Sequence, residues 1–248
     1  MLDEILAATR RRLDRDGVVL SGPGPSSRDF AGALAAPGLQ VIAEIKRRSP
    51  SRGDLNIGLD PVDRANAYER GGAAAISVLT EPDYFAGSLD DLTAVRTAVG
   101  VPVLRKDFII EPRQIEESRA AGADALLLIV AALGEARLAM MLGECGKVGI
   151  QALVEAHTAE EAAVAMRVGA SVVGINNRDL ATFHTDLAVA ERIAPVVAGQ
   201  RVLVAESGVS SPSGAARMAA AGYDAILVGE ALVMSSDPAA LIGRLTGS

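Results

Sequence analysis

Short aliphatic runs alternate with longer amphipathic segments along most of this chain. Four runs share one plan, in which a glycine suited to a helix end precedes a turn and an apolar strand, and they begin at Gly72, Gly122, Gly169 and Gly222. Successive glycines lie 50, 47 and 53 residues apart, which accommodates two βα units each time. Further strands are predicted at 101–104, 149–154, 201–205 and, first of all, 40–45. The pattern therefore contains eight strands.

The segments between these strands predict helices. Four prolines suit the first turn of a helix, where a missing N–H costs nothing: Pro61, Pro112, Pro212 and Pro238. Thr158 with Glu161 three residues later indicates a capping box. Continuous aliphatic strands are typical of a parallel sheet that is buried on both faces. Eight strands alternating with helices predict an α/β protein with a (β/α)8 TIM barrel, and an open doubly wound sheet is the alternative.

The predicted barrel begins only near residue 40. Residues 1–16 predict an amphipathic helix, and the Gly/Pro/Ser-rich stretch 21–37 is interpreted as a connector. We therefore expect one domain spanning 1–248, in which an N-terminal helical extension of 1–39 precedes a barrel of 40–248.

Composition narrows the class of protein. The chain has 248 residues, half of them hydrophobic, and a formal net charge of −7, which argues against a non-specific nucleic-acid binder. Its single cysteine, Cys145, permits no intramolecular disulfide. The sequence contains no Cys/His cluster of the kind that binds a metal ion. The start lacks a signal-peptide pattern, and the apolar run 125–133 is too short to span a bilayer. We expect a cytoplasmic protein with no membrane, nucleic-acid or metal partner.

Polar residues end the predicted aliphatic strands, where a barrel collects its ligand chemistry. Six residues share this position: Glu44, Lys46, Lys106, Glu155, Asn176 and Glu206. Alternation places Glu44 and Lys46 on one face, which points into the barrel mouth because their neighbours are apolar. Partly buried charges are costly unless paired, and a barrel does not need such a ring for stability. The set favours a catalytic site over a solvated rim, although Lys106 and Glu155 could form only a structural ion pair.

Small residues after the last two strands indicate an anion site. Ser207, Gly208 and Gly229 supply free backbone N–H groups, and a short helix is predicted to begin at Glu230. This is where barrels bind phosphate, although the glycines could be plain turn residues. The carboxylate of Glu230 disfavours phosphate unless it turns away.

Two further segments lie at predicted strand exits. Residues 47–54 form a basic loop that we interpret as a mobile, anion-attracting lid, with an ordinary exposed loop as the alternative. Phe85 and Phe108 follow the second and third strands and predict an aromatic pocket, or they close the barrel top. Neither His157 nor His184 has a partner pattern, and Cys145 is interpreted as core filling.

Several stretches together resemble one enzyme family. They are IAEIKRRSPS at 42–51, SVLT at 77–80 with YFAGS at 84–88, RKDFII at 105–110, LVE at 153–155, GINNRDL at 174–180 and AESGV at 205–209. Nearly the whole chain is similar to the indole-3-glycerol-phosphate synthases of tryptophan biosynthesis. The resemblance implies a carbon–carbon carboxy-lyase that converts 1-(2-carboxyphenylamino)-1-deoxyribulose 5-phosphate into indole-3-glycerol phosphate, CO₂ and water without a cofactor or metal.

The resemblance also implies roles for the polar ring. Lys106 is then the general acid for ring closure, and Glu155 the acid/base partner in dehydration. Lys46 is then a contact for the substrate carboxylate or phosphate and a second proton donor. Glu44 and Asn176 are implied to orient Lys106 and the substrate hydroxyls, and Glu206 completes the ring.

Substrate binding is implied at the remaining positions. Arg178 is expected to contact the anthranilate carboxylate or to orient Glu155. The residues implied to hold the phosphate or line the pocket are Ser49, Phe85, Phe108, Ser207, Gly208, Gly229 and Glu230. Some family members have serine where this chain has Glu230, so a backbone N–H contact survives there but a hydroxyl contact does not.

Two alternatives remain open at this stage. One is a phosphoribosylanthranilate-isomerase-like barrel, which the lysine at the third strand and the lack of a cysteine at any strand exit disfavour. The other is a non-catalytic barrel that binds a phosphorylated ligand. A monomer is expected because a closed barrel has no edge strands. Its helix surfaces leave room for a weak dimer or for association with other tryptophan-pathway enzymes.

Overall fold

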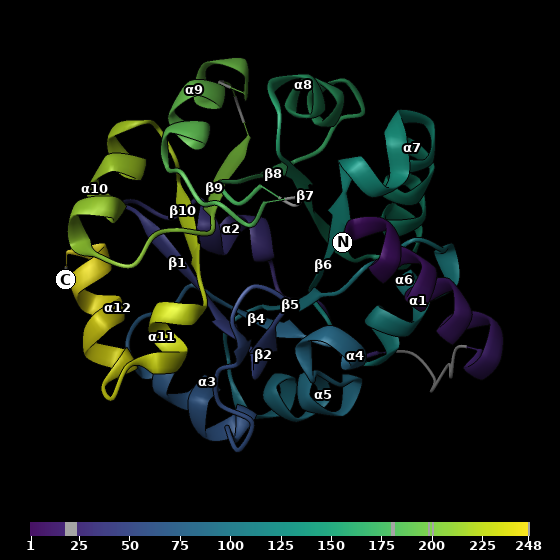
Figure 1. The fold of residues 1–248 in the computed structure, drawn as a ribbon, viewed down its shortest axis with the longest axis horizontal. Coiled ribbons are helices and arrows are strands. Elements are labelled where there is room, and N and C mark those ends of the chain that lie inside the picture. The colour runs from purple at the N-terminus through teal and green to yellow at the C-terminus, as the bar shows by residue number, and fades with distance from the viewer. Residues whose placement is uncertain (18–23, 180–181, 198, 200, 248) are drawn as a thin grey trace.

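The computed structural model describes residues 1–17, 24–179, 182–197, 199 and 201–247. Parallel strands close into a barrel in the order β1-β10-β9-β8-β7-β6-β5-β4, with helices around the outside (Figure 1). The barrel strands are β1 (Gln40–Ile45), β4 (Ala75–Leu79), β5 (Val103–Lys106), β6 (Ala125–Ile129), β7 (Gln151–Ala156), β8 (Val172–Asn176), β9 (Val202–Glu206) and β10 (Ala225–Val228). The predicted TIM barrel is confirmed, and the open sheet is excluded.

The helices and the small hairpin complete the element order. They are α1 (Leu2–Asp16), α2 (Phe30–Leu34), β2 (Arg48–Ser49), β3 (Gly53–Asp54), α3 (Pro61–Arg70), α4 (Pro82–Phe85), α5 (Leu89–Ala98), α6 (Pro112–Ala120), α7 (Val130–Val148), α8 (Ala159–Arg167), α9 (Ala188–Val197), α10 (Pro212–Ala220), α11 (Glu230–Met234) and α12 (Pro238–Thr246). The four predicted proline starts are confirmed at α3, α6, α10 and α12.

The repeated glycines act as helix terminators. Gly72, Gly122, Gly169 and Gly222 have φ values of 87°, 95°, 83° and 91°, in the left-handed region where glycine is favoured. This conformation turns the chain from each helix back into the next strand. The repeat seen in the sequence is therefore a repeat of one backbone turn.

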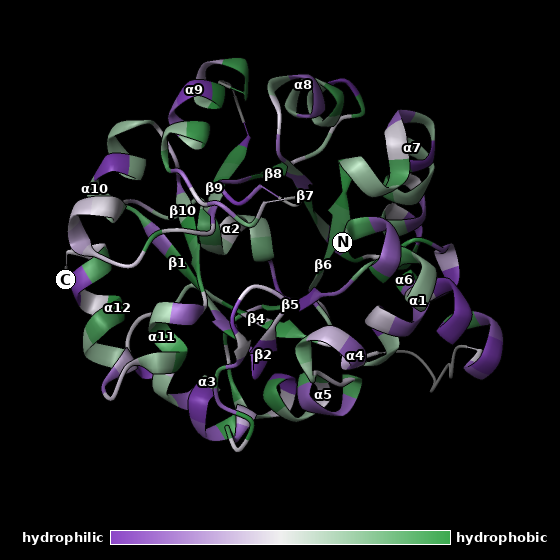
Figure 2. Cartoon of the chain, viewed as in Figure 1, coloured by the Kyte–Doolittle hydropathy of each residue, from purple (hydrophilic) through white to green (hydrophobic). Residues whose placement is uncertain are grey.

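The strands bury both faces (Figure 2). On β1, Val41, Ala43 and Ile45 pack in the layer shared with the surrounding helices, while Ile42 faces the barrel interior. Glu44 is the next inward position after Ile42, which the period of two requires. The same alternation operates on every second strand, so an apolar interior layer underlies a polar one: Ile42, Leu104, Leu153 and Val204 lie beneath Glu44, Lys106, Glu155 and Glu206.

The predicted connector 21–37 contains a structural element that the sequence reading missed. Its residues 24–37 are described by the structure, whereas 21–23 lie outside the described residues. Within it, α2 buries Phe30 and Leu34 completely among interior residues such as Ala75 and Ala125, which begin their strands. The helix therefore closes the amino-terminal end of the barrel.

Three strand predictions were displaced. Strands β5, β7 and β9 begin at Val103, Gln151 and Val202, one or two residues later than predicted, and they extend further. The structural strands include the polar residues at their ends, Lys106, Glu155 and Glu206, because the backbone continues the sheet there.

One local prediction also needs correction, the capping box at Thr158. Thr158 caps α8 by accepting from the N–H of Glu161, but the Glu161 carboxylate accepts from His157 N, at 2.7 Å, rather than completing a capping box. Loop 47–54 carries the antiparallel β2–β3 hairpin, which Arg48 and Asp54 join at 2.6 Å. Within the described chain, no helix is both long enough and apolar enough to cross a bilayer.

Candidate active site

A cavity of about 440 Å³ opens at the carboxyl ends of the barrel strands. Its volume lies in the range of roughly 300–1,000 Å³ that is usual for small-molecule sites. All the site residues predicted from the sequence line it: Glu44, Lys46, Ser49, Phe85, Lys106, Phe108, Glu155, Asn176, Arg178, Ser207, Gly208, Glu206, Gly229 and Glu230. The motif residue Leu180 lies outside the described residues. Segments far apart in the sequence thus meet around one space.

The two lysines of the cavity are held by different carboxylates. Lys106 Nζ lies 3.3 Å from Glu155 Oε2 and 3.4 Å from Glu206 Oε2. Lys46 Nζ donates to Glu44 Oε1 at 2.7 Å. Glu44 thus hydrogen-bonds to Lys46, while its charge also acts on Lys106, and its implied role toward Lys106 and the substrate hydroxyls stays a prediction. The side-chain oxygen of Asn176 accepts from the N–H of Arg178, at 3.0 Å.

Burial and neighbouring charges shift the pKa values of the ionisable groups in this layer. Burial opposes the ammonium of Lys106, but the carboxylates of Glu155, Glu206 and Glu44 outweigh it and raise the Lys106 pKa above its ordinary value. Burial likewise opposes the carboxylate of Glu44, but Lys46 and Lys106 lower its pKa below the usual range. Lys106 is therefore a cation throughout the neutral range.

The pKa values of Glu155 and Glu206 are shifted in opposite directions. Burial would raise the pKa of Glu155, but the ammonium of Lys106 and the imidazole of His157 outweigh it and lower that pKa. Burial and the negative charge of Glu155 raise the pKa of Glu206 well above the usual range. The surroundings therefore favour the carboxylate form of Glu155 and the protonated form of Glu206.

Gly174 makes room for the Glu206 carboxyl. A Cβ at this position would overlap Oε1 of Glu206. We expect Gly174→Ala to lower the free energy of unfolding by ~1–3 kcal/mol through overpacking. Because a misplacement of about 1 Å costs on the order of 10²-fold in rate, kcat should fall by that amount.

This prediction has a matched control in α7. A Cβ at Gly146 meets nothing within 4 Å, so Gly146→Ala should leave both stability and kcat unimpaired. Chemical unfolding and steady-state assays of the two variants provide the measurement. A Gly174→Ala variant as stable and active as the wild type would contradict the assigned packing of Glu206.

The predicted phosphate side of the cavity has a specialised backbone. Ser207 and Gly208 both have positive φ, at 66° and 87°, and for the serine this conformation costs about 1–3 kcal/mol. Gly229 caps α11, and a Cβ there would overlap the Glu44 carboxyl and approach Lys46 Nζ. The Glu230 carboxylate turns away to Arg52, at 3.1 Å. The backbone N–H groups thus remain available beside Lys46.

Aromatic and further polar side chains line other parts of the cavity. The rings of Phe85 and Phe108 lie 6.3 Å apart between centroids and are tilted by 37°. Ser49 is buried beside Ser51, and Arg178 donates to Ser51 Oγ at 2.7 Å rather than to Glu155. The hairpin that carries Ser49 is therefore tied to the segment after β8.

The sequence reading did not identify α1 as part of the site. Met1, Leu2 and Ile5 line the cavity. The sequence did contain an indication of this contact. The predicted helix 1–16 is amphipathic, and its apolar face must pack against another part of the protein.

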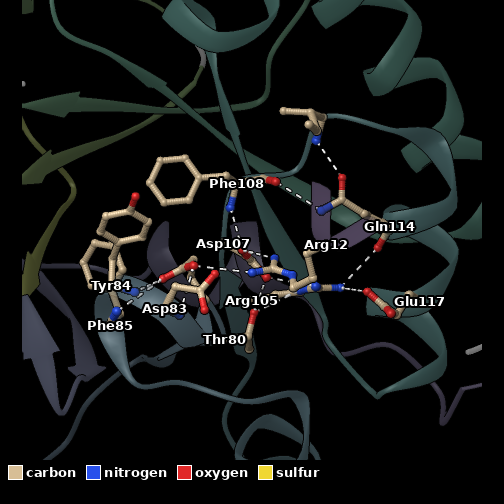
Figure 3. A network of polar contacts seen from close by, with 12 residues as sticks. Arg12, Thr80, Asp83, Tyr84, Phe85, Arg105, Asp107, Phe108, Gln114 and Glu117 are labelled. Carbon is tan, nitrogen blue, oxygen red and sulfur yellow. Dashed lines mark hydrogen bonds and ion pairs between the residues drawn. The ribbon is translucent and has the colours of Figure 1, made fainter. Parts of the chain in front are cut away.

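A buried polar network fastens α1 to the strand end that carries Lys106 (Figure 3). Arg12 lies 3.3 Å from Glu81 Oε1 and 3.6 Å from Asp107 Oδ1. Asp107 also accepts from Arg105, at 2.9 Å, and from the N–H of Phe108, at 2.8 Å. Burial alone would raise the pKa of Asp107, but the guanidinium groups of Arg105 and Arg12 outweigh burial and lower that pKa.

We expect Arg12→Ala to loosen α1 from the cavity. Removing one partner of a buried pair leaves Glu81 uncompensated, so the free energy of unfolding should fall by ~1–3 kcal/mol. KM should rise more than kcat falls, because the chemical groups remain while a wall of the cavity is lost. Arg11→Ala, at an exposed position of the same helix, is the control. Equal KM values for the two variants would show that α1 does not contribute to binding.

A (β/α)8 barrel with a charged cavity at its strand ends defines a barrel enzyme for a small anionic substrate. In the described part of the chain, no group of His, Cys, Asp and Glu side chains is arranged to hold a metal ion. The chain belongs to the indole-3-glycerol phosphate synthase family, whose model matches residues 6–245. The resemblance drawn from the motifs is therefore confirmed.

Individual relatives agree with this assignment. The chain is 49% identical to the indole-3-glycerol phosphate synthase of Mycobacterium avium, over 99% of this chain and 93% of that protein. It is 54% identical to the enzyme of the same name from Mycolicibacterium vanbaalenii, over 89% and 81% of the two chains. A solved 3-hexulose-6-phosphate synthase matches the fold with a TM-score of 0.64 at 19% identity, over 85% and 98% of the chains. That last similarity concerns the fold alone.

Proposed function

We propose that this protein catalyses the indole-3-glycerol-phosphate synthase reaction with Lys106 as the proton donor for ring closure. The observation that carries the proposal is a buried, cationic Lys106 between Glu155 and Glu206 in a cavity of a member of this family. The substrate is 1-(2-carboxyphenylamino)-1-deoxyribulose 5-phosphate, and the product forms by ring closure, decarboxylation and dehydration.

Ring closure requires an acid at the ketone. The aromatic carbon that bears the carboxylate attacks the carbonyl carbon, and negative charge develops on the carbonyl oxygen. Lys106 donates its proton there, and the neighbouring carboxylates keep it charged until that step. Phe85 and Phe108 supply an apolar wall for the anthranilate ring.

Decarboxylation needs no metal or cofactor, because the electrons of the breaking C–C bond flow into the ring iminium. Dehydration then requires an acid for the leaving hydroxyl and a base for a ring proton. Lys46 is the second lysine at the cavity, and Glu155 is the carboxylate whose pKa its surroundings lower. We assign the acid role in this step to Lys46 and the base role to Glu155.

Binding uses the remaining groups. The backbone N–H groups of Ser207, Gly208 and Gly229 hold the phosphate, with Lys46 as the nearby cation. Arg178 serves the anthranilate carboxylate. Glu206, whose pKa is raised by burial and by Glu155, lies beside Lys106 and completes the polar ring.

Incubation of the purified protein with the carboxyphenylamino sugar phosphate tests this proposal. Indole absorbance and fluorescence should appear together with one equivalent of CO₂. Ligand-induced stabilisation without indole formation would favour the non-catalytic barrel instead. Turnover of phosphoribosylanthranilate alone would favour the isomerase alternative.

The proposal extends to the organisation and setting of the protein. We propose one domain of 1–248, because the extension 1–39 contributes both a cavity wall and the closure of the barrel of 40–248. A monomer is proposed because the closed barrel has no edge strand. A cytoplasmic location is proposed because the phosphorylated substrate cannot diffuse through a membrane.

A further inference from the structure

His157 lies directly behind the Glu155 carboxyl, although the sequence shows no partner for it. Its Nε2 is 3.4 Å from Glu155 Oε1, and its Nδ1 is 3.5 Å from Glu161 Oε2. The imidazole is largely buried, with 11% of the side chain exposed. His157 thus bridges a carboxylate of the cavity and a carboxylate outside it.

The local sequence fixes this bridge. Residues 155 and 157 are two apart at the end of β7, so their side chains leave the backbone on the same side. Glu161 stands in the first turn of α8, and its carboxylate also accepts from the N–H of His157, at 2.7 Å. Glu161 is therefore anchored to the backbone that carries the imidazole.

Three charged groups act on the imidazole. Glu155 lies on its own strand, Glu161 faces it from α8, and Lys106 acts from β5. Burial and Lys106 oppose the imidazolium, but the two carboxylates outweigh them and raise the His157 pKa above its ordinary value. The two carboxyls of the cavity are not equivalent in this respect, because His157 contacts Glu155 and not Glu206.

We propose that His157 is a positioning residue that, through its contact with Glu155, favours the carboxylate form of Glu155 and so keeps it available as the base. The proposal rests on the assigned role of Glu155 in the reaction. The imidazole contacts Glu155 and not Glu206, whereas Lys106 lies at nearly equal distances from the two carboxyls, 3.3 and 3.4 Å. Glu161 contacts the imidazole from outside the cavity, at 3.5 Å.

Imidazole NMR titration of the ligand-free protein tests the charge bridge without any assay of activity. The chain has two histidines, so His157→Gln assigns the two signals. In wild-type protein, His157 should titrate above the ordinary histidine range. Glu161→Gln should lower that midpoint by about one unit, while its amide oxygen still accepts from the His157 N–H. Glu160→Gln, at the exposed neighbouring position, should leave the midpoint unchanged.

The pH dependence of kcat tests the consequence for Glu155. His157→Gln should move the acid limb of the profile about one unit to higher pH, which is about a tenfold loss at any pH on that limb. Activity should recover at higher pH. Glu161→Gln should shift the limb in the same direction by less.

Two outcomes would overturn the proposal. One is a His157 that titrates in the ordinary range and does not respond to Glu161→Gln. The other is a His157→Gln variant whose kcat is lowered equally at every pH, as expected for a merely structural residue. Absence of indole formation by the wild-type protein would instead contradict the proposed function, and the NMR titration would still decide the charge bridge.

Discussion

Replacement of Lys106 by alanine is expected to lower kcat by ~10²–10⁴-fold, the usual contribution of a general acid. Lys106 supplies the proton for ring closure, and its ammonium is the charge that Glu155 and Glu206 share. Without it, the pKa of Glu155 should rise toward that of a buried, unpaired carboxyl. The variant therefore loses the general acid itself, and the raised pKa of Glu155 also lowers the fraction of Glu155 that can act as a base.

Steady-state assays of indole formation and circular dichroism of the same sample provide the measurement. The barrel should remain folded, because the interior layer under Lys106 is apolar and stays intact. Lys147→Ala is the control, since that lysine is exposed on α7 and pairs only with Glu144 among the described residues. A folded Lys106→Ala enzyme within a few-fold of wild-type kcat would refute the assignment.

Glu155→Gln is expected to lower kcat by a similar ~10²–10⁴-fold, with little change in KM. Glutamine keeps the shape and can still accept a hydrogen bond from Lys106, but it cannot take a proton during dehydration. The ring-closure and decarboxylation steps retain their proton donor, so CO₂ release should be impaired less than indole formation.

A single-turnover experiment that follows both products separates these steps. Glu116→Gln, at an exposed position of α6, is the matched control and should behave as wild type. Equal loss of CO₂ and indole would place Glu155 in ring closure rather than in dehydration. Unchanged rates for both would remove Glu155 from the chemistry altogether.

Much of the fold was predictable from local patterns. The left-handed turns at Gly72 and its three counterparts, and the proline-started helices, depend only on the φ angles that those residues permit. Alternation on β1 was sufficient to place Glu44 and Lys46 on the inner face, since a strand has a period of two. The family could be identified from the sequence for the same reason. Its motifs lie at strand ends, and the two-residue period of the strands sets where those ends fall.

Partners across the barrel were not predictable in this way. Lys106, Glu155 and Glu206 stand on alternate strands, β5, β7 and β9, and they meet because a closed sheet turns every second strand's inward side chains into one layer. The hydrogen bond between Glu44 and Lys46 is a detail that the implied role of Glu44 toward Lys106 and the substrate hydroxyls did not contain. No sequence pattern predicted the contact of His157 with Glu155 and Glu161.

The chain alone determined that there are eight strands, which face of each is apolar, and which residue types stand at their ends. These features follow from conformational preference and periodicity over a few neighbouring residues. The tertiary structure decided which charges lie close enough to pair, that α2 closes the amino-terminal end of the barrel, and that α1 lines the cavity at the other end. Those outcomes depend on distances of a few ångströms between distant segments and on the exclusion of water from the space between them, and no local pattern contains either.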